Sequence, residues 1–226
     1  MKGVKVWDLP SRIAHWALAL SILGSYGSAE YGWFPMQWHF YFGYAAITLA
    51  LFRVLWGFWG SEHARFRNFV RGPSAVWRYL ESLGDKNSSE TTGHSALGGW
   101  AVLVLLAATL AQGVSGLFNS DDIEWFGPLN EKASSNLVEQ MSWFHNNFYN
   151  VLLIIIGVHI VAAVLYWLVK KQNLIGPMIT GVKRSIQAED AKQKPLWLAL
   201  LLLALSAAAL WALIQFWPTA PASRGF

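Results

Sequence analysis

Four histidines inside long apolar stretches are the residues of this sequence most able to do chemistry. His15 and His39 lie near the starts of the first two stretches, and His145 and His159 lie together in a later one. An ionisable side chain in a membrane-length apolar segment indicates a functional site by default. In an α-helix, the fourteen residues between His145 and His159 place them about 40° apart around the axis and about 21 Å apart along it. These two side chains therefore face one direction at two depths.

Each of these two depths also holds a histidine from another predicted helix. With successive helices crossing the membrane in alternating directions, His15 lies at the depth of His159, and His39 at the depth of His145. Two imidazoles that face each other across a helical bundle can hold a haem iron through both axial positions. Two such pairs predict two haems. The alternatives are hydrogen-bonded core histidines, or zinc, which would need three or four ligands at one depth.

The sequence contains no cysteine, six histidines and four methionines. Without cysteine there can be no disulfide, thiolate metal site, iron–sulfur cluster or cysteine nucleophile. Any metal must therefore be held by His, Met or carboxylate side chains.

Glycines and two further polar residues accompany the four histidines. A porphyrin needs space between helix backbones, and glycine provides it because it has no side chain. Close helix packing is the alternative role for these glycines. The glycines near the histidines are Gly24, Gly27, Gly43, Gly113, Gly116 and Gly157. Arg53 could neutralise a haem propionate, because guanidinium pairs with carboxylate through two hydrogen bonds, but loop topology alone could also place it there. His94 could hydrogen-bond locally, or could contact a propionate or a quinone head group.

The elements that must position these residues are membrane helices. Hydrophobic residues make up 54% of the 226-residue chain and charged residues 13%, against about 25% charged in an ordinary soluble domain. Five intervals lack Asp, Glu, Lys and Arg, and each can hold the roughly 20 apolar residues of one span. We predict spans at 13–33, 39–58, 96–118, 146–169 and 196–217. We expect no cleavable signal peptide, because no small-residue cleavage site follows the first apolar stretch.

The sequence also predicts a short interfacial helix, a helix N-cap and a solvated histidine. Residues 72–83 predict a short amphipathic helix at the membrane interface. Asn136, with Glu139 three residues later, predicts the N-cap and capping box of the fourth long helix. His63 lies in an arginine-rich loop, where we expect it to be solvated.

Basic residues predict the orientation of the chain in the membrane. The N-terminus, the 53–90 connection and the 170–194 connection hold 15 of the 17 Lys and Arg residues. The positive-inside rule therefore predicts that the N-terminus lies in the cytoplasm and the C-terminus on the outer side of the membrane. On the outer side, the 119–145 segment carries five acidic residues against the single basic residue Lys132.

Several stretches together resemble the bacterial cytochrome b561 family, close to the b-type cytochrome subunits of nickel–iron hydrogenases. The matching stretches are WDLPSRIAHW at 7–16, His39 through FRVLWGF at 52–58, GHSALGG at 93–99, NLIGPMITG at 173–181, and the two histidines of the fourth span. The resemblance implies two non-covalent b haems in a four-helix core. His15 and His159 would ligate the inner haem, and His39 and His145 the outer one.

With this resemblance, the expectation is an all-α protein of the bacterial inner membrane, with its C-terminus in the periplasm, that transfers electrons between quinone and a periplasmic partner. Residues 1–190 would form the four-helix di-haem domain, and 191–226 an additional fifth span with a short tail. We expect lipid, quinone and a soluble cytochrome c as partners and no nucleic acid, with a homodimer left open. The alternatives are the membrane anchor of a periplasmic hydrogenase or dehydrogenase, and, from a different class, a proton or metal transporter that uses its histidines. We assign no catalytic residue.

Overall fold

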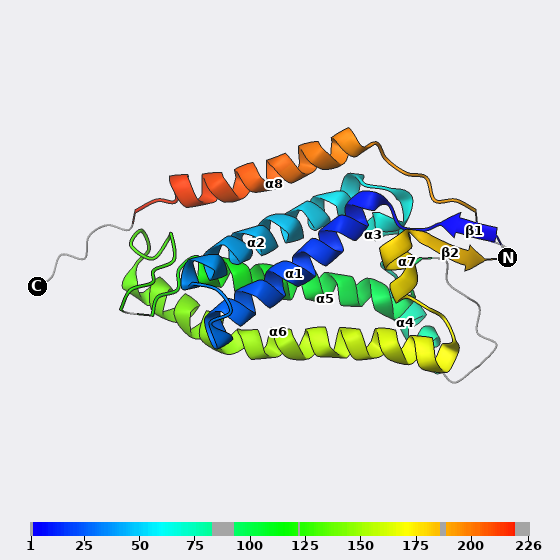
Figure 1. Ribbon diagram of the computed structural model, residues 1–226, viewed down its shortest axis with the longest axis horizontal. Helices are drawn as coiled ribbons and strands as arrows, with labels where there is room; N and C mark the ends of the chain where they lie inside the picture. Colours follow the sequence, from blue (N-terminus) through cyan, green and yellow to red (C-terminus); the bar gives the residue numbers. More distant parts are fainter. Residues whose placement is uncertain (1, 83–92, 122, 186–188, 220–226) are drawn as a thin grey trace, which may run out of the picture.

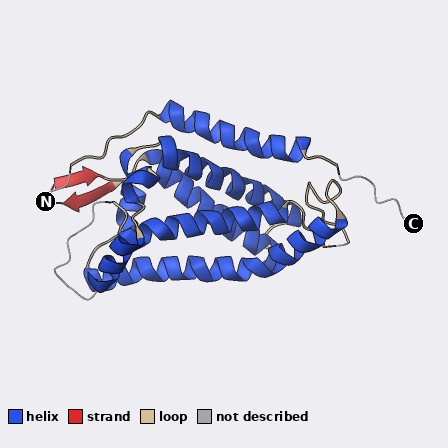
Figure 2. Ribbon diagram, turned by 180° about the vertical axis from the view of Figure 1, so that it is seen from behind, coloured by secondary structure: helices blue, strands red, loops and turns tan. Residues whose placement is uncertain are grey.

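The computed structural model describes residues 2–82, 93–121, 123–185 and 189–219. Four long helices lie side by side along most of the molecule (Figure 1): α1 Leu9–Tyr31, α2 Met36–Trp59, α5 Ala96–Gly116 and α6 Ser135–Lys170. A fifth long helix, α8 Leu196–Phe216, lies along the outside of this bundle, where it packs on α2. Short elements cluster at the end of the bundle that holds the N-terminus (Figure 2): η1 Glu62–Ala64, α3 Phe66–Phe69, α4 Pro73–Ser82 and α7 Ile175–Thr180.

Four helices are long and apolar enough to cross a membrane, counting only the residues that the structure describes: α2, α5, α6 and α8. By length and composition these four helices are candidate membrane spans, and they fall in four of the five predicted intervals. Helix α1 has 23 residues but is not among the four, because four serines, Arg12 and Glu30 lower its hydropathy. The prediction that α1 is also a span, which would make five, stays a prediction.

The start of α1 is fixed by a buried aspartate. Asp8 is the N-cap, and its Oδ1 accepts a hydrogen bond of 2.8 Å from the backbone N–H of Ser11. Its Oδ2 accepts a hydrogen bond of 2.9 Å from the indole N–H of Trp56, which is fully buried on α2. An aspartate that caps a helix satisfies N–H groups otherwise left without partners. Here the same carboxylate also joins α1 to α2, and so fixes the level at which His15 stands.

Helix α6 is continuous over 36 residues, so His145 and His159 do lie on one helix. Its N-cap differs from the prediction. Ser134 is the cap, with its hydroxyl accepting from the N–H of Leu137. Asn136 lies inside the first turn, where its Oδ1 accepts from the side chain of Gln140. Serine followed by a serine and an asparagine offers several capping side chains in a row, and local sequence does not choose between them.

A two-stranded antiparallel sheet is the part of the fold that the all-α prediction missed. Strand β1 (Lys2–Lys5) pairs with β2 (Val182–Ser185), with Val4 opposite Lys183. The two strands are about 180 residues apart in sequence, and four-residue strands carry too little alternation to be recognised. The sheet joins the chain before α1 to the chain after α7, and Val4 and Val6 are both buried beside it.

Helix α8 is fastened to the bundle at several points. Ala199, Leu202, Ser206 and Leu210 are buried, and the Ser206 hydroxyl donates to the carbonyl of Leu202. At the far end, Nζ of Lys132 donates to the backbone carbonyls of Ile214 and Gln215 at 2.7 and 3.3 Å. A lysine at a helix C-terminus satisfies carbonyls that lack helical partners and complements the helix dipole.

Candidate functional site

The structure brings the four histidines together as two pairs, at opposite ends of the bundle. His15 on α1 faces His159 on α6, with ring centres 6.4 Å apart and ring planes inclined by 55°. His39 on α2 faces His145 on α6, with ring centres 6.1 Å apart and ring planes at 88°. These are the two pairs that helix periodicity and topology predict.

Both ring separations fit two imidazoles that bind one metal from opposite sides. A histidine–metal bond is about 2.0–2.1 Å and the ring centre lies about 1.1 Å behind the bonded nitrogen, so ring centres about 6.3 Å apart are expected. The observed 6.4 and 6.1 Å lie close to that value. A direct N–H···N hydrogen bond between the two rings, with the nitrogens about 2.9 Å apart, would bring the ring centres to about 5 Å. Among the described residues, no group of three or more His, Asp or Glu side chains gathers at a metal-binding distance.

Hydrogen bonds orient both rings of the His39–His145 pair. The Nδ1–H of His39 donates to the carbonyl of Ser25 on α1 at 3.0 Å, and the Nδ1–H of His145 donates to the carbonyl of Gln112 on α5 at 2.9 Å. The Gln112 side chain donates in return to the carbonyl of His145 at 3.0 Å. Metal-binding histidines typically donate their second ring N–H to a carbonyl, which fixes the tautomer. In both rings this bond leaves Nε2 with its lone pair available.

The His15–His159 pair differs in its surroundings. Nδ1 of His15 is buried and has no hydrogen-bond partner among the described residues, and the His15 ring stands edge-on to Trp16 with ring centres 5.1 Å apart. The sequence pointed to the four histidines but not to Ser25 and Gln112. Gln112 was recognisable as an amide side chain within an apolar span, where a polar group needs a partner.

The six glycines near the histidines divide into three groups. A Cβ at Gly116 would lie 2.7 Å from Cε1 and 3.0 Å from Nδ1 of His145, so only glycine lets that ring sit against α5. A Cβ at Gly43 or Gly157 would meet no atom within 4 Å, which leaves room beside His39 and His159. The remaining three serve close packing, the alternative role, against the side chains of Phe42, Trp33 and Ile47: Gly24, Gly27 and Gly113.

Arg53 lies on α2 near the His15–His159 pair. Its guanidinium donates to the carbonyl of Ala64 at 3.1 Å and lies over the rings of Phe66 and Phe69, at 5.6 and 5.9 Å from their centres. A cation over an aromatic face is held by the quadrupole of the ring. These contacts hold Arg53 within the protein and use one of its five N–H donors, so the predicted role with a propionate stays a prediction.

His94 lies at the same end, just before α5. Its ring is packed against Phe69 and Trp7, with ring centres 4.3 and 4.6 Å away, and its Nδ1 is buried without a partner among the described residues. Burial, reinforced by the positive charge of Arg53, lowers the pKa of His94 to about 3, so its imidazole is neutral at pH 7. His63 is partly buried beside Trp7 rather than solvated as predicted, and burial lowers its pKa as well.

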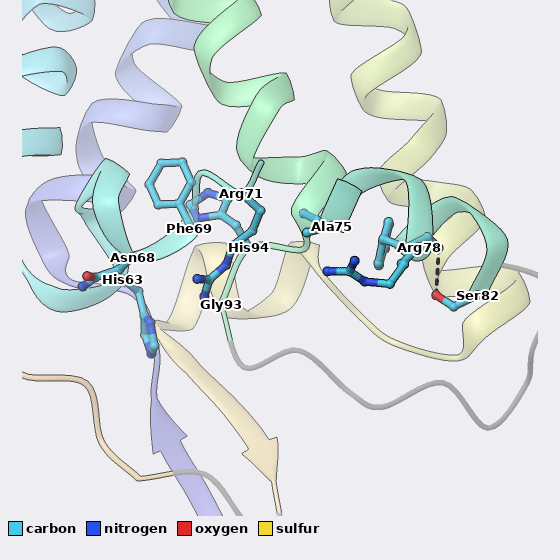
Figure 3. Close-up of a pocket in the computed structure, with 11 residues that line it drawn as sticks. His63, Asn68, Phe69, Arg71, Ala75, Arg78, Ser82, Gly93 and His94 are labelled. Carbon is cyan, nitrogen blue, oxygen red and sulfur yellow. Dashed lines mark hydrogen bonds between the residues drawn. The ribbon is translucent and has the colours of Figure 1, made fainter. Parts of the chain in front are cut away.

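His63 and His94 both line a cavity of about 500 Å³ under α4 (Figure 3). The cavity is bounded by α3, α4 and the start of α5. A helix, α4, forms where the short amphipathic helix was predicted; it has no buried residue and exposes Trp77, while Leu83 lies outside the described residues. Its position at the membrane interface stays a prediction.

The sequence matches the family of prokaryotic cytochrome b561 proteins over residues 6–181, which is most of the chain. The chain belongs to the prokaryotic cytochrome b561 family. It is therefore a multi-pass membrane b-type cytochrome that transfers electrons, and the match favours electron transfer over the transporter alternative. No curated protein and no solved structure matches this cytochrome. The family match ends at residue 181, before α8.

Proposed function

We propose that this cytochrome binds two b haems, each ligated by the two histidines of one pair. It would carry electrons across the membrane between quinone and a soluble periplasmic partner. The observation that carries the proposal is the pair of ring separations, 6.4 and 6.1 Å, at two levels of one bundle. When bound, the haems supply reversible one-electron chemistry.

The contribution of the chain is to hold the two sites at fixed positions. Helix α6 supplies one ligand to each site, and the 14 residues between them set the separation of about 21 Å along its axis. The carbonyls of Ser25 and Gln112 accept from Nδ1–H of His39 and His145, which would leave Nε2 of each ring for the iron. Apolar side chains on α2 and α5 exclude water between the sites, and a low dielectric limits the reorganisation that accompanies a change of charge.

Haem content tests the proposal directly. The purified full-length cytochrome should contain two haems per polypeptide in a pyridine haemochrome assay, and both should be six-coordinate and low-spin, because each site offers two imidazoles. The chain concentration is best determined by amino-acid analysis, since 14 tryptophans and the haems both absorb in the ultraviolet. One haem per polypeptide would contradict the proposal.

We place the basic end of the bundle in the cytoplasm and the 119–145 segment in the periplasm, with α1 and α8 as further spans. The short elements at the N-terminal end and the turns between them carry Arg65, Arg67, Arg71 and Arg78, whereas the 119–145 segment carries Glu124, Glu131 and Glu139. The positive-inside rule supports this orientation.

The acidic outer segment supports a cationic soluble partner, such as a basic cytochrome c. Hydrogen bonds from the N–H groups of Trp125, Ile123 and Glu124 lower the pKa of Asp121 and keep it charged. Lys132, the basic residue of this segment, is drawn to the carbonyls at the end of α8. The acidic side chains therefore dominate this surface, and opposite charges accelerate the encounter of two proteins.

Salt should slow electron transfer between this surface and a basic cytochrome c. The Debye length falls from about 30 Å at 0.01 M to about 10 Å at 0.1 M salt, so the rate should fall several-fold over that range. Stopped-flow rates of the Glu124→Gln/Glu131→Gln double variant should be lower at low salt and depend less on salt. Glu189→Gln, at the opposite end of the bundle, is the matched control and should behave as the original cytochrome. A rate independent of salt would contradict the role of the acidic segment.

A further inference from the structure

The cavity under α4 has the chemistry of an anion site. Among its lining residues are the guanidinium groups of Arg71 and Arg78 and the polar side chains of Asn68 and Ser82 (Figure 3). None of the described residues that line it is acidic. Two described carboxylates next to lining residues in sequence have other partners: Glu81 accepts from the indole of Trp77, and Glu62 accepts from the backbone N–H of Lys192.

Both arginines are available to a ligand. Within the described residues, neither the Arg71 nor the Arg78 guanidinium makes a hydrogen bond or an ion pair, and both side chains are exposed. Hydrogen bonds to neighbouring helices fix the backbone around both arginines. The indole of Trp100 donates to the carbonyl of Arg71 at 2.9 Å, and the Tyr79 hydroxyl meets the hydroxyl of Tyr166 on α6. Two unpaired guanidinium groups on a fixed frame can bind a phosphate through several charge-assisted hydrogen bonds.

The position of α4 indicates where the anion comes from. Helix α4 has no buried residue, and it exposes Trp77 and Leu80 at 66% and 40% of their surface while Arg78 lines the cavity. A short helix that exposes tryptophan and leucine and also carries an arginine is suited to the level of the lipid head groups. Basic pockets of this kind at the cytoplasmic side of membrane proteins bind anionic lipid head groups. A cavity of about 500 Å³ is large enough for such a head group.

We propose that this cavity binds the phosphate-bearing head group of an anionic phospholipid, with Arg71 and Arg78 as its ligands and the acyl chains beside Trp77 and Leu80. His94, whose buried Nδ1 has no partner among the described residues, would contact the head group at the inner end of the cavity. The bound lipid would hold α4 at the membrane surface and cover the end of the bundle that contains His15 and His159. It does not depend on how many haems the cytochrome carries.

Native mass spectrometry of the purified, haem-loaded cytochrome in uncharged detergent tests the site. Phosphatidylglycerol should bind in preference to phosphatidylcholine with the same acyl chains. The Arg71→Gln/Arg78→Gln double variant should bind phosphatidylglycerol about tenfold more weakly, which corresponds to about 1.4 kcal/mol. Arg67→Gln, which removes an exposed arginine on the neighbouring α3 outside the cavity, is the matched control and should leave the affinity unchanged.

Three results would overturn the proposal. The first is equal phosphatidylglycerol affinity in the double variant and the original protein. The second is displacement of the lipid by millimolar inorganic phosphate, which would indicate a soluble anion as the ligand. The third is unchanged lipid binding with a shifted haem potential, which would assign the arginines to a propionate. The haem spectrum recorded on the same samples reports separately on the histidine pairs, and an unchanged melting temperature shows that the double variant is folded.

Discussion

His159→Ala should remove the same haem as His15→Ala and leave the other haem bound. The ring centres of His15 and His159 are 6.4 Å apart, whereas the 14 residues that separate His159 from His145 correspond to about 21 Å of helix. A planar porphyrin held on both faces needs its two ligands at one level. His39→Ala and His145→Ala should therefore share the complementary loss.

Redox titration followed in the visible spectrum is the best measurement for this prediction, because a single variant can retain a weakened five-coordinate haem. His63→Ala is the matched control. His63 is a partly buried histidine outside the pairs, and its replacement should leave both redox transitions in place. The pairing would be wrong if His15→Ala and His39→Ala abolished one and the same transition.

Gly116→Leu should remove the haem of the His39–His145 site and spare the other. Even a Cβ at this position would lie 2.7 Å from Cε1 of His145, so a leucine must push the ring out of place. The displaced ring would lose its hydrogen bond to the carbonyl of Gln112 and no longer face His39. We expect haem content to fall by about half, with the remaining spectrum matching that of His145→Ala.

Gly113→Leu is the control for this second prediction. Gly113 lies one turn earlier on α5, and a Cβ there would meet Cγ1 of Ile47 at 2.5 Å rather than a histidine. Both leucines disturb the packing of α5, but only the one at Gly116 touches a proposed ligand. If the two variants lost the same haem to the same degree, helix packing and not ring position would explain the effect.

Much of this cytochrome follows from patterns that are local in sequence. Apolar intervals of membrane length and the fourteen-residue spacing of His145 and His159 depend only on helix geometry, and helix α6 runs unbroken through both. The uneven distribution of basic residues predicts that the 53–90 and 170–194 connections share a side, and α3, α4 and α7 from these connections lie at one end of the bundle (Figure 1).

Other features were decided only by the tertiary structure. The carbonyls that orient His39 and His145 belong to α1 and α5, and which main-chain atom reaches an imidazole depends on the rotation and crossing of whole helices. The partners of Arg53 and the β1–β2 sheet likewise join segments far apart in the chain. The sequence by itself determined which side chains share a depth, because helical rise is fixed. The packing of one helix on another decided what each ring contacts, because the pattern within one helix does not specify its rotation against the next.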